Sequence, residues 1–253
     1  MEVALLTVGD ELLAGDTVNT NATWLAERLS ERGVTVARIL TIPDERALIA
    51  EWVRNYGDEF DAVIVTGGLG GTPDDVTIDA VADAFDRDLV VSEQALAAVE
   101  ERLADIGDAV PDLDLDVEAE ASIPEGARPL LNPEGLAPGC VIENVYVLPG
   151  IPRELKAMFD TVAEEFAGDA VTQLLYTTEP EANLVGTLEA IATEFDVAVG
   201  CYPDREARHN RLKITATDAD TLDAAAAWLR ERVEVSETPI ERDWGRSEEL
   251  GEN

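Results

Sequence analysis

Short apolar runs and segments with helical spacing alternate along the first third of the chain. Apolar runs typical of buried strands cover residues 3–8, 34–42 and 62–66. Apolar residues at helical spacing, with glycine or proline near the ends, predict helices over residues 20–32, 43–56 and 73–85. Strands that alternate with helices in this way favour βαβ units. The pattern therefore predicts an α/β fold, three-layered and Rossmann-like, whose mostly parallel sheet is covered on both faces.

The pattern is less regular between residues 86 and 168. A helix is predicted near residues 92–106, a strand pair or hairpin over 140–148, and a helix from about 152 that ends near Gly168. The acidic stretch 108–120 lies between them, with Leu113, Leu115 and Val117 alternating inside it. We expect this stretch to be a solvated surface excursion, and the Pro- and Gly-rich segment 123–136 to be irregular.

After Gly168 the pattern restarts as a β-α-β-β-α unit, which indicates a second, smaller α+β domain. Its predicted strands cover residues 170–178, 197–201 and 211–217, and its predicted helices cover 181–195 and 219–233. The predicted domains are therefore residues 1–168 and 169–235. Residues 236–253 are polar and acidic without periodicity, and we expect a frayed tail there.

Charge narrows the classes of protein to which the chain can belong. Its 253 residues include 54 Asp and Glu against 18 Lys and Arg, for a net charge of −36, and 46% are hydrophobic. That hydrophobic content argues against disorder, so the charge belongs on a folded surface. Such a surface repels phosphate backbones and anionic lipid, so we expect no nucleic-acid and no membrane partner. With only Lys156 and Lys213 as lysines, the composition favours a protein from a halophile over an ordinary acidic cytosolic protein.

The remaining composition predicts a soluble, cytoplasmic protein without a disulfide framework or a zinc site. No apolar run approaches the roughly 20 residues that span a bilayer, and the first residues lack the positive flank of a signal peptide. Cys140 and Cys201 have no CxxC spacing, and we expect both in the core. His209, the only histidine, is expected at the surface or at a strand edge.

The strongest chemical motif is the sequence TGGLGGTPDD over residues 66–75, between a predicted buried strand and a predicted helix. Ligands bind at the carboxyl ends of parallel strands, and glycines let backbone N–H groups approach a phosphate beside a helix N-terminus. The motif lacks both the GxGxxG dinucleotide pattern and a GK[ST] ending. A glycine-rich turn with a purely structural role is the alternative.

Asp74 and Asp75 favour a ligand site. They either cap the next helix or hold a divalent cation such as Mg²⁺ beside a phosphate. Placing carboxylates next to an anion is costly without a metal, so a phosphate site here implies a metal site.

A second polar cluster follows the first predicted strand. Asp10 or Glu11 could add a third carboxylate, and Asn19 or Asn21 could bind a base or ribose. A turn followed by a helix cap is the alternative, which suits Asn19 and Thr20 as well as a ligand does.

Taken together, these motifs resemble the N-terminal domain of the competence/damage-inducible CinA family, in the MoaB/MogA-like molybdopterin-binding superfamily. The resemblance covers about residues 1–168 and rests on four motifs in order: residues 9–13 (GDELL), 19–21 (NTN), 66–75 and 148–152 (LPGIP). Residues 170–235 resemble the small KH-type domain that follows in that family, although the GxxG loop that clamps nucleic acid is missing. Gly71 stands where the family usually has proline. The family's C-terminal nicotinamide-nucleotide deamidase domain has no counterpart in the chain, so we expect a stand-alone form and do not carry that activity over.

The resemblance implies a metal-dependent pyrophosphatase that acts on ADP-ribose or a related dinucleotide; similar domains in FAD synthases are linked to FAD hydrolysis. It implies phosphate binding by Gly67, Gly68, Gly70 and Thr72, and ligand contacts by Asn19, Asn21, Pro149 and Gly150. Asp74 and Asp75 are the implied metal ligands, and Asp75 and Glu11 the implied catalytic carboxylates. The alternatives are a molybdopterin-binding or adenylyl-transfer protein and a non-catalytic nucleotide-binding module. Relatives of this fold assemble as dimers or trimers, so we expect a homo-oligomer.

Overall fold

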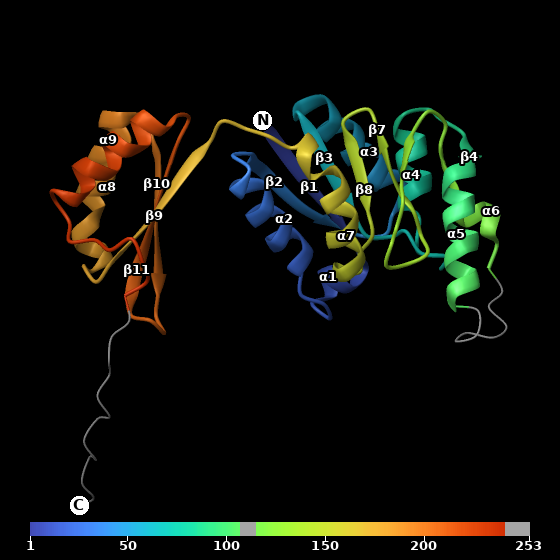
Figure 1. Ribbon diagram of the computed structural model, residues 1–253, viewed down its shortest axis with the longest axis horizontal. Coiled ribbons are helices and arrows are strands. Elements are labelled where there is room, and N and C mark those ends of the chain that lie inside the picture. Colours follow the sequence, from blue (N-terminus) through green and yellow to red (C-terminus); the bar gives the residue numbers. More distant parts are fainter. Residues whose placement is uncertain (107–114, 241–253) are drawn as a thin grey trace, which may run out of the picture. The chain divides into compact units, whose positions relative to one another are not determined.

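The computed structural model describes residues 1–106 and 115–240 (Figure 1). The chain divides into two compact units, Met1–Gly168 and Asp169–Asn253. None of the described helices combines the length and the apolar character needed to cross a membrane. Each unit has its own sheet and its own buried core.

A six-stranded sheet forms the centre of the large unit, in the order β2-β1-β3-β8-β7-β6. Its strands are β1 (Glu2–Val8), β2 (Thr35–Ile42), β3 (Ala62–Thr66), β6 (Arg128–Leu130), β7 (Gly139–Ile142) and β8 (Val145–Leu148). Strands β2, β1, β3 and β8 are parallel, with Leu5 beside both Ile39 and Ile64. Strand β7 pairs antiparallel with β8, and β6 pairs antiparallel with β7. The mostly parallel sheet predicted from the sequence is thus confirmed.

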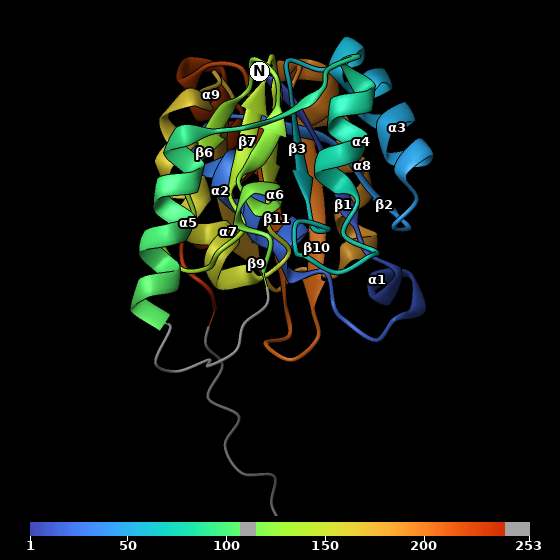
Figure 2. The same ribbon diagram turned by 90° about the vertical axis from the view of Figure 1, so that its right-hand side faces the viewer.

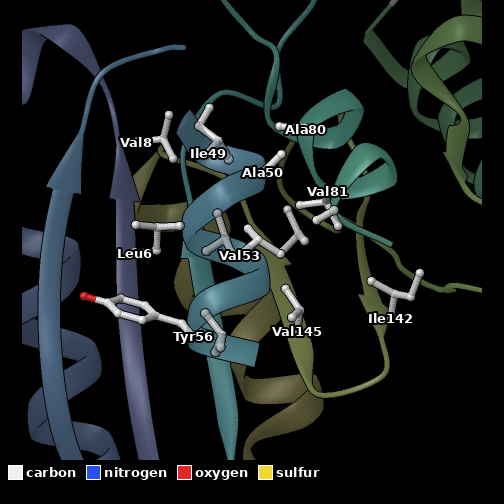
Figure 3. Packing of buried hydrophobic residues seen from close by; sticks show 14 of the residues in the cluster. Leu6, Val8, Ile49, Ala50, Val53, Tyr56, Ala80, Val81, Ile142 and Val145 are labelled. Carbon is white, nitrogen blue, oxygen red and sulfur yellow. The ribbon is translucent and has the colours of Figure 1, made fainter. Parts of the chain in front are cut away.

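Helices cover both faces of this sheet because side chains alternate along the buried strands. Val3 and Leu5 of β1 pack with α2 (Thr20–Glu31) and α7 (Pro152–Val162). On the other face, Leu6 and Val8 pack with α3 (Arg46–Glu59) and α4 (Thr77–Ala84), as Figure 3 shows. In Figure 2, α3 and α4 lie on one side of β3 and α2 and α7 on the other. The three-layer prediction is therefore confirmed.

Several shorter elements of the large unit differ from the prediction. They are α1 (Asp10–Ala14), β4 (Leu89–Val91), α6 (Val117–Glu120), β5 (Ser122–Pro124) and the 3₁₀ turn Ala163–Glu165. Helix α5 (Glu93–Ile106), in contrast, confirms the helix predicted near residues 92–106. The expectation of an irregular segment over 123–136 was wrong in part, because β5 pairs with β4 and β6 pairs with β7. Within the acidic stretch, Leu113 lies outside the described residues, while α6 gives residues 117–120 a regular structure.

The small unit is a three-stranded antiparallel sheet with two helices, in the predicted β-α-β-β-α order. Its elements are β9 (Val171–Thr177), α8 (Glu181–Phe195), β10 (Ala198–Asp204), β11 (His209–Ala216) and α9 (Ala219–Arg230), with sheet order β10-β11-β9. Leu175, Leu212 and Ile214 form its core with Leu184, Ile191 and Leu229 of the two helices.

Two expectations about single segments are corrected here. His209 is not a surface residue: it is 7% exposed, and its ring packs edge-on against Tyr176 at 5.2 Å between centroids. The expected frayed tail is ordered at its start, where Ser236 exchanges two backbone hydrogen bonds of 2.8 Å with Tyr176. The rest of that segment, residues 241–253, lies outside the described residues. Cys140 is buried as expected, and burial raises the pKa of its thiol to about 12, whereas Cys201 is half-buried beside the small core.

Candidate functional site

All four parallel strands of the large unit deliver residues to the same cavity. Val8 ends β1, Thr66 ends β3 and Pro149 follows β8, and these three residues all line it. Asp44 reaches the cavity from the segment after β2. Because β2 and β3 lie on opposite sides of β1, the cavity occupies the point where the strand order reverses. Open α/β sheets bind ligands at that point.

The cavity has a volume of about 810 Å³, within the range of cavities that hold nucleotide-sized ligands. Apolar side chains line part of its wall, including Leu12, Leu69, Leu136 and the exposed Val18 and Ile151. The carboxylates on the described wall are those of Glu11, Asp44, Asp74, Asp75, Glu120, Glu134 and Glu154.

Glycines are required at the start of the loop after β3. Gly67 has φ +100°, and a Cβ there would lie 2.3 Å from the carbonyl oxygen of Val8. Gly68 has φ +66°, and a Cβ there would lie 2.4 Å from Oγ1 of Thr77. That hydroxyl is buried without a hydrogen-bond partner among the described residues. Both positions combine left-handed backbone with close packing, so only glycine fits the loop without strain.

The second half of this loop differs from the predicted helix start. Thr72 to Asp75 form a turn with Pro73 at its second position, closed by a 2.9 Å hydrogen bond from the Asp75 N–H to the Thr72 carbonyl. Asp75 Oδ2 accepts hydrogen bonds from the N–H and the hydroxyl of Thr72. Helix α4 begins only at Thr77, and neither carboxylate caps it. The capping alternative for Asp74 and Asp75 is therefore wrong.

Asp44 lies near the carboxylates of Asp10, Glu11 and Asp74, although it belongs to none of the sequence motifs. Burial raises its pKa, although the Asp10 N–H, 2.8 Å from its Oδ2, lowers it. The negative charges of Asp10, Glu11 and Asp74 raise the Asp44 pKa further. Glu120, beside Gly71 of the glycine loop, also has a raised pKa, first from burial and then from the charge of Asp75. Several carboxylates thus repel one another in the space where a cation would bind.

These oxygen donors suit a hard divalent cation, but they do not form a complete cage. Among the described residues, no group of three or more His, Cys, Asp and Glu side chains is arranged to hold a metal by itself. Mg²⁺ is commonly held by one or two carboxylates together with waters and ligand phosphates. The described donors therefore suit a cation only in company with waters and an anionic ligand.

Two asparagines that line the cavity are held in place by hydrogen bonds. Asn19 caps α2 by accepting from the Ala22 N–H at 3.1 Å, and its Nδ2 donates to the buried Thr7 hydroxyl at 3.0 Å. Asn21 Nδ2 donates to the Gly150 carbonyl at 2.6 Å, which joins α2 to the turn after β8. Both side chains line the cavity while holding its wall in place.

A hydrogen-bonded loop after β6 completes the wall. Asn132 Oδ1 accepts from the N–H groups of Glu134 and Gly135 at 3.1 and 2.8 Å. Its Nδ2 donates to the Ala137 carbonyl at 3.1 Å and to Glu154 Oε2 at 2.8 Å. One side chain thus holds a segment that no helix or strand contains.

The structure brings nearly all the residues predicted from the sequence together. The cavity wall contains Glu11, Asn19, Asn21, Gly67, Gly68, Gly70, Asp74, Asp75, Pro149 and Gly150. Thr72 does not line the cavity and instead bonds Asp75. Sequence reasoning missed Asp44, Arg102, Glu120 and Glu134, which lie outside the motifs. For Asp44 a signal existed, since it follows a predicted strand as Glu11 does.

Family models match both units of the chain. A family model described as "probable molybdopterin binding domain" matches residues 4–168, and one described as "FAD synthase, middle domain" matches residues 169–239. A protein from Pyrococcus furiosus is 37% identical over 249 residues, which is 92% of this chain and 97% of that protein.

Two further similarities carry the CinA name. A CinA-like protein from Citrifermentans bemidjiense is 38% identical over 245 residues, and the match spans 92% of this chain but only 58% of that protein. The crystal structure of "the protein CinA with unknown function" from Thermoplasma acidophilum superimposes with a TM-score of 0.58 at 34% identity. It covers 65% of this chain and 97% of that one.

Proposed function

The chain belongs to the family of CinA-like proteins with a molybdopterin-binding domain, and from that premise we propose that it is a metal-dependent nucleotide pyrophosphatase. Its substrate would be ADP-ribose or a related dinucleotide. The observation that carries the proposal is the cavity at the reversal of strand order, where a glycine loop and several carboxylates face the same space. A cation in such a space stabilises an anion that binds there.

Each part of the cavity has a role in this reaction. The loop of Gly67, Gly68 and Gly70 lets the substrate phosphates approach the backbone closely. A divalent cation bound beside Asp74 and Asp75 would neutralise phosphate charge and lower the pKa of a bound water. Glu11 and Asp44 lie on the same wall and are the carboxylates available to accept a proton from the attacking water. Asn19, Asn21 and the turn at Pro149 and Gly150 bound the region for the remainder of the nucleotide.

The test is hydrolysis of ADP-ribose by purified protein with Mg²⁺ in about molar KCl, followed by chromatography of the released AMP. Asp74→Asn and Asp75→Asn should each lower kcat/KM by about 100-fold or more, because each removes a charge that holds the cation. Asn at position 75 can still accept the hydrogen bonds of Thr72, so the loop should remain folded.

Asp160→Asn is the matched control, since Asp160 is an exposed residue of α7 that does not line the cavity. It should leave turnover unchanged. Folded wild-type protein that hydrolyses none of ADP-ribose, FAD and NAD would overturn the proposal. Binding of a nucleotide without consumption would favour a non-catalytic binding module instead.

The match to a molybdopterin-binding model favours a second candidate function, binding or adenylylation of a pterin cofactor precursor. The apolar wall with Leu12, Val18 and Ile151 suits a flat heterocycle as well as it suits adenine. A thermal shift, or a mass difference in native mass spectrometry, with molybdopterin but not with ADP-ribose would select this candidate.

A further inference from the structure

Arg102 is the one cationic side chain among the described residues that line the cavity. It lies near the end of α5 (Glu93–Ile106) and is half-buried. Leu115 and Glu120, which line the same side, lie next to Gly71 of the glycine loop. Arg102 therefore brings a positive charge to a wall that is otherwise acidic.

The guanidinium of Arg102 is weakly engaged. Within the described part of the chain it makes a single hydrogen bond, 3.3 Å long, to the carbonyl oxygen of Glu134, and no ion pair. An arginine presents five N–H donors, and among the described residues Arg102 uses one of them.

Arg153 provides an internal comparison, because it donates to the same Glu134 carbonyl at the same distance of 3.3 Å. Unlike Arg102, it also forms an ion pair with the Glu134 carboxylate, and it does not line the cavity. Arg153, which does not line the cavity, thus balances the charge of Glu134. The positive charge of Arg102 is left facing the cavity.

We propose that Arg102 binds a phosphate group of the ligand directly and so makes the cavity select anionic nucleotides over neutral nucleosides. The inference rests on the proposed nucleotide function and names the residue that recognises the ligand's charge. An arginine fork forms two charge-assisted hydrogen bonds with a phosphate, which outweigh one long bond to a carbonyl. A cation at Asp74 and Asp75 and the guanidinium of Arg102 would then neutralise the diphosphate from two sides.

The experiment measures binding of ADP-ribose, AMP and adenosine by calorimetry in EDTA and about 0.5 M KCl, with wild type, Arg102→Gln, Arg102→Lys and Arg153→Gln. Arg102→Gln should weaken ADP-ribose and AMP by about 10- to 100-fold, the range for loss of a charged hydrogen bond. Adenosine should bind equally to wild type and variant. Arg102→Lys keeps the charge but not the fork, so its loss should be smaller and again confined to the two anionic ligands.

Arg153→Gln is the comparison variant: it removes an arginine from the same carbonyl but no side chain from the cavity wall, and it leaves the Glu134 carboxylate without its ion pair. If Arg102→Gln and Arg153→Gln weaken all three ligands alike, Arg102 only supports the Glu134 loop and the inference is wrong. Unchanged affinities in Arg102→Gln also overturn it, while ADP-ribose hydrolysis by the wild type keeps the proposed function. A wild type that binds none of the three ligands in EDTA, and none when the titrations are repeated with Mg²⁺, contradicts both. Should Arg102→Gln fail to fold by circular dichroism, the selectivity of Arg102→Lys decides.

Discussion

At the scale of single residues, the glycine loop is held by steric limits that can be measured. Gly68→Ala would place a methyl group against the Thr77 hydroxyl in left-handed backbone. We expect it to lower the free energy of unfolding by about 1–3 kcal/mol, as judged by urea denaturation. Gly186→Ala in α8, where a Cβ meets no atom within 4 Å, should instead raise it by about 0.5–1 kcal/mol. A neutral Gly68→Ala would contradict the geometry of the loop.

Asp44 offers a second test at this scale, through pH. Its pKa in the folded chain is raised above the ordinary value of 3.8. Between the unfolded and the folded pKa the native state keeps a proton that the unfolded chain has lost, so stability falls as pH rises through this window. The penalty is complete above the folded pKa and absent well below 3.8.

Asp44→Asn removes that penalty and retains an oxygen acceptor for the Asp10 N–H. In metal-free buffer at pH 7 we expect the variant to be more stable than wild type, by less than about 1 kcal/mol because the site is partly solvated. The difference should shrink as the pH is lowered toward 3. Thermal melts across this range would contradict the account if the variant were less stable at pH 7.

At the scale of elements, Asn19 connects a helix start to the sheet. Asn19→Ala removes both the cap of α2 and the donor to the buried Thr7 hydroxyl. The expected loss in the free energy of unfolding is about 1–2 kcal/mol. Asn19→Asp keeps the capping oxygen and loses only the donor, so its loss should be smaller. Equal losses in the two variants would mean that the bond to Thr7, and not the cap, carries the effect.

The elements that sequence predicts well are those whose apolar patterns are long or closed by glycine. Strands β1 and β3 follow from runs that end at Gly9 and Gly67. The five-residue helix α1 and the three-residue strands β5 and β6 are too short for any periodicity to register. Helix α4 begins later than predicted because Thr72 to Asp75 form a hydrogen-bonded turn. The apolar pattern of this segment is helical and does not indicate that turn.

The site residues that sequence predicts are likewise those that lie in a motif or directly after a predicted strand. Glu11, Asn21 and Asp74 follow strands or sit in motifs, and parallel strands bring their ends to one edge of the sheet. Arg102 and Glu120 come from α5 and α6, which carry no motif, and only the folding of these helices against the cavity makes them lining residues. The sequence indicated carboxylates in excess but gave no reason to choose one arginine among sixteen.

At the scale of the whole molecule, the net charge of −36 predicts a strong response to salt. Screening in about 1 M salt acts over about 3 Å and should relieve repulsion between surface carboxylates. We expect the midpoint of thermal unfolding to rise by about 4–8 °C between 0.1 and 2 M KCl, equivalent to about 2 kcal/mol. Sucrose at matched osmolality should have a smaller effect, since it does not screen charge. A flat response to KCl would contradict adaptation of this surface to high salt.

The hydrogen bonds of Asn132 should also slow the opening of the loop after β6. Hydrogen bonds from the N–H groups of Glu134 and Gly135 to one side chain should protect these amides from exchange with solvent deuterium, although they lie outside every helix and strand. Mass spectrometry after deuteration should therefore find them exchanging as slowly as neighbouring strands, and Asn132→Ala should release them. Slow exchange would mean that this wall is in place before a ligand arrives, so that the encounter rate is set by diffusion and not by closure of a loop.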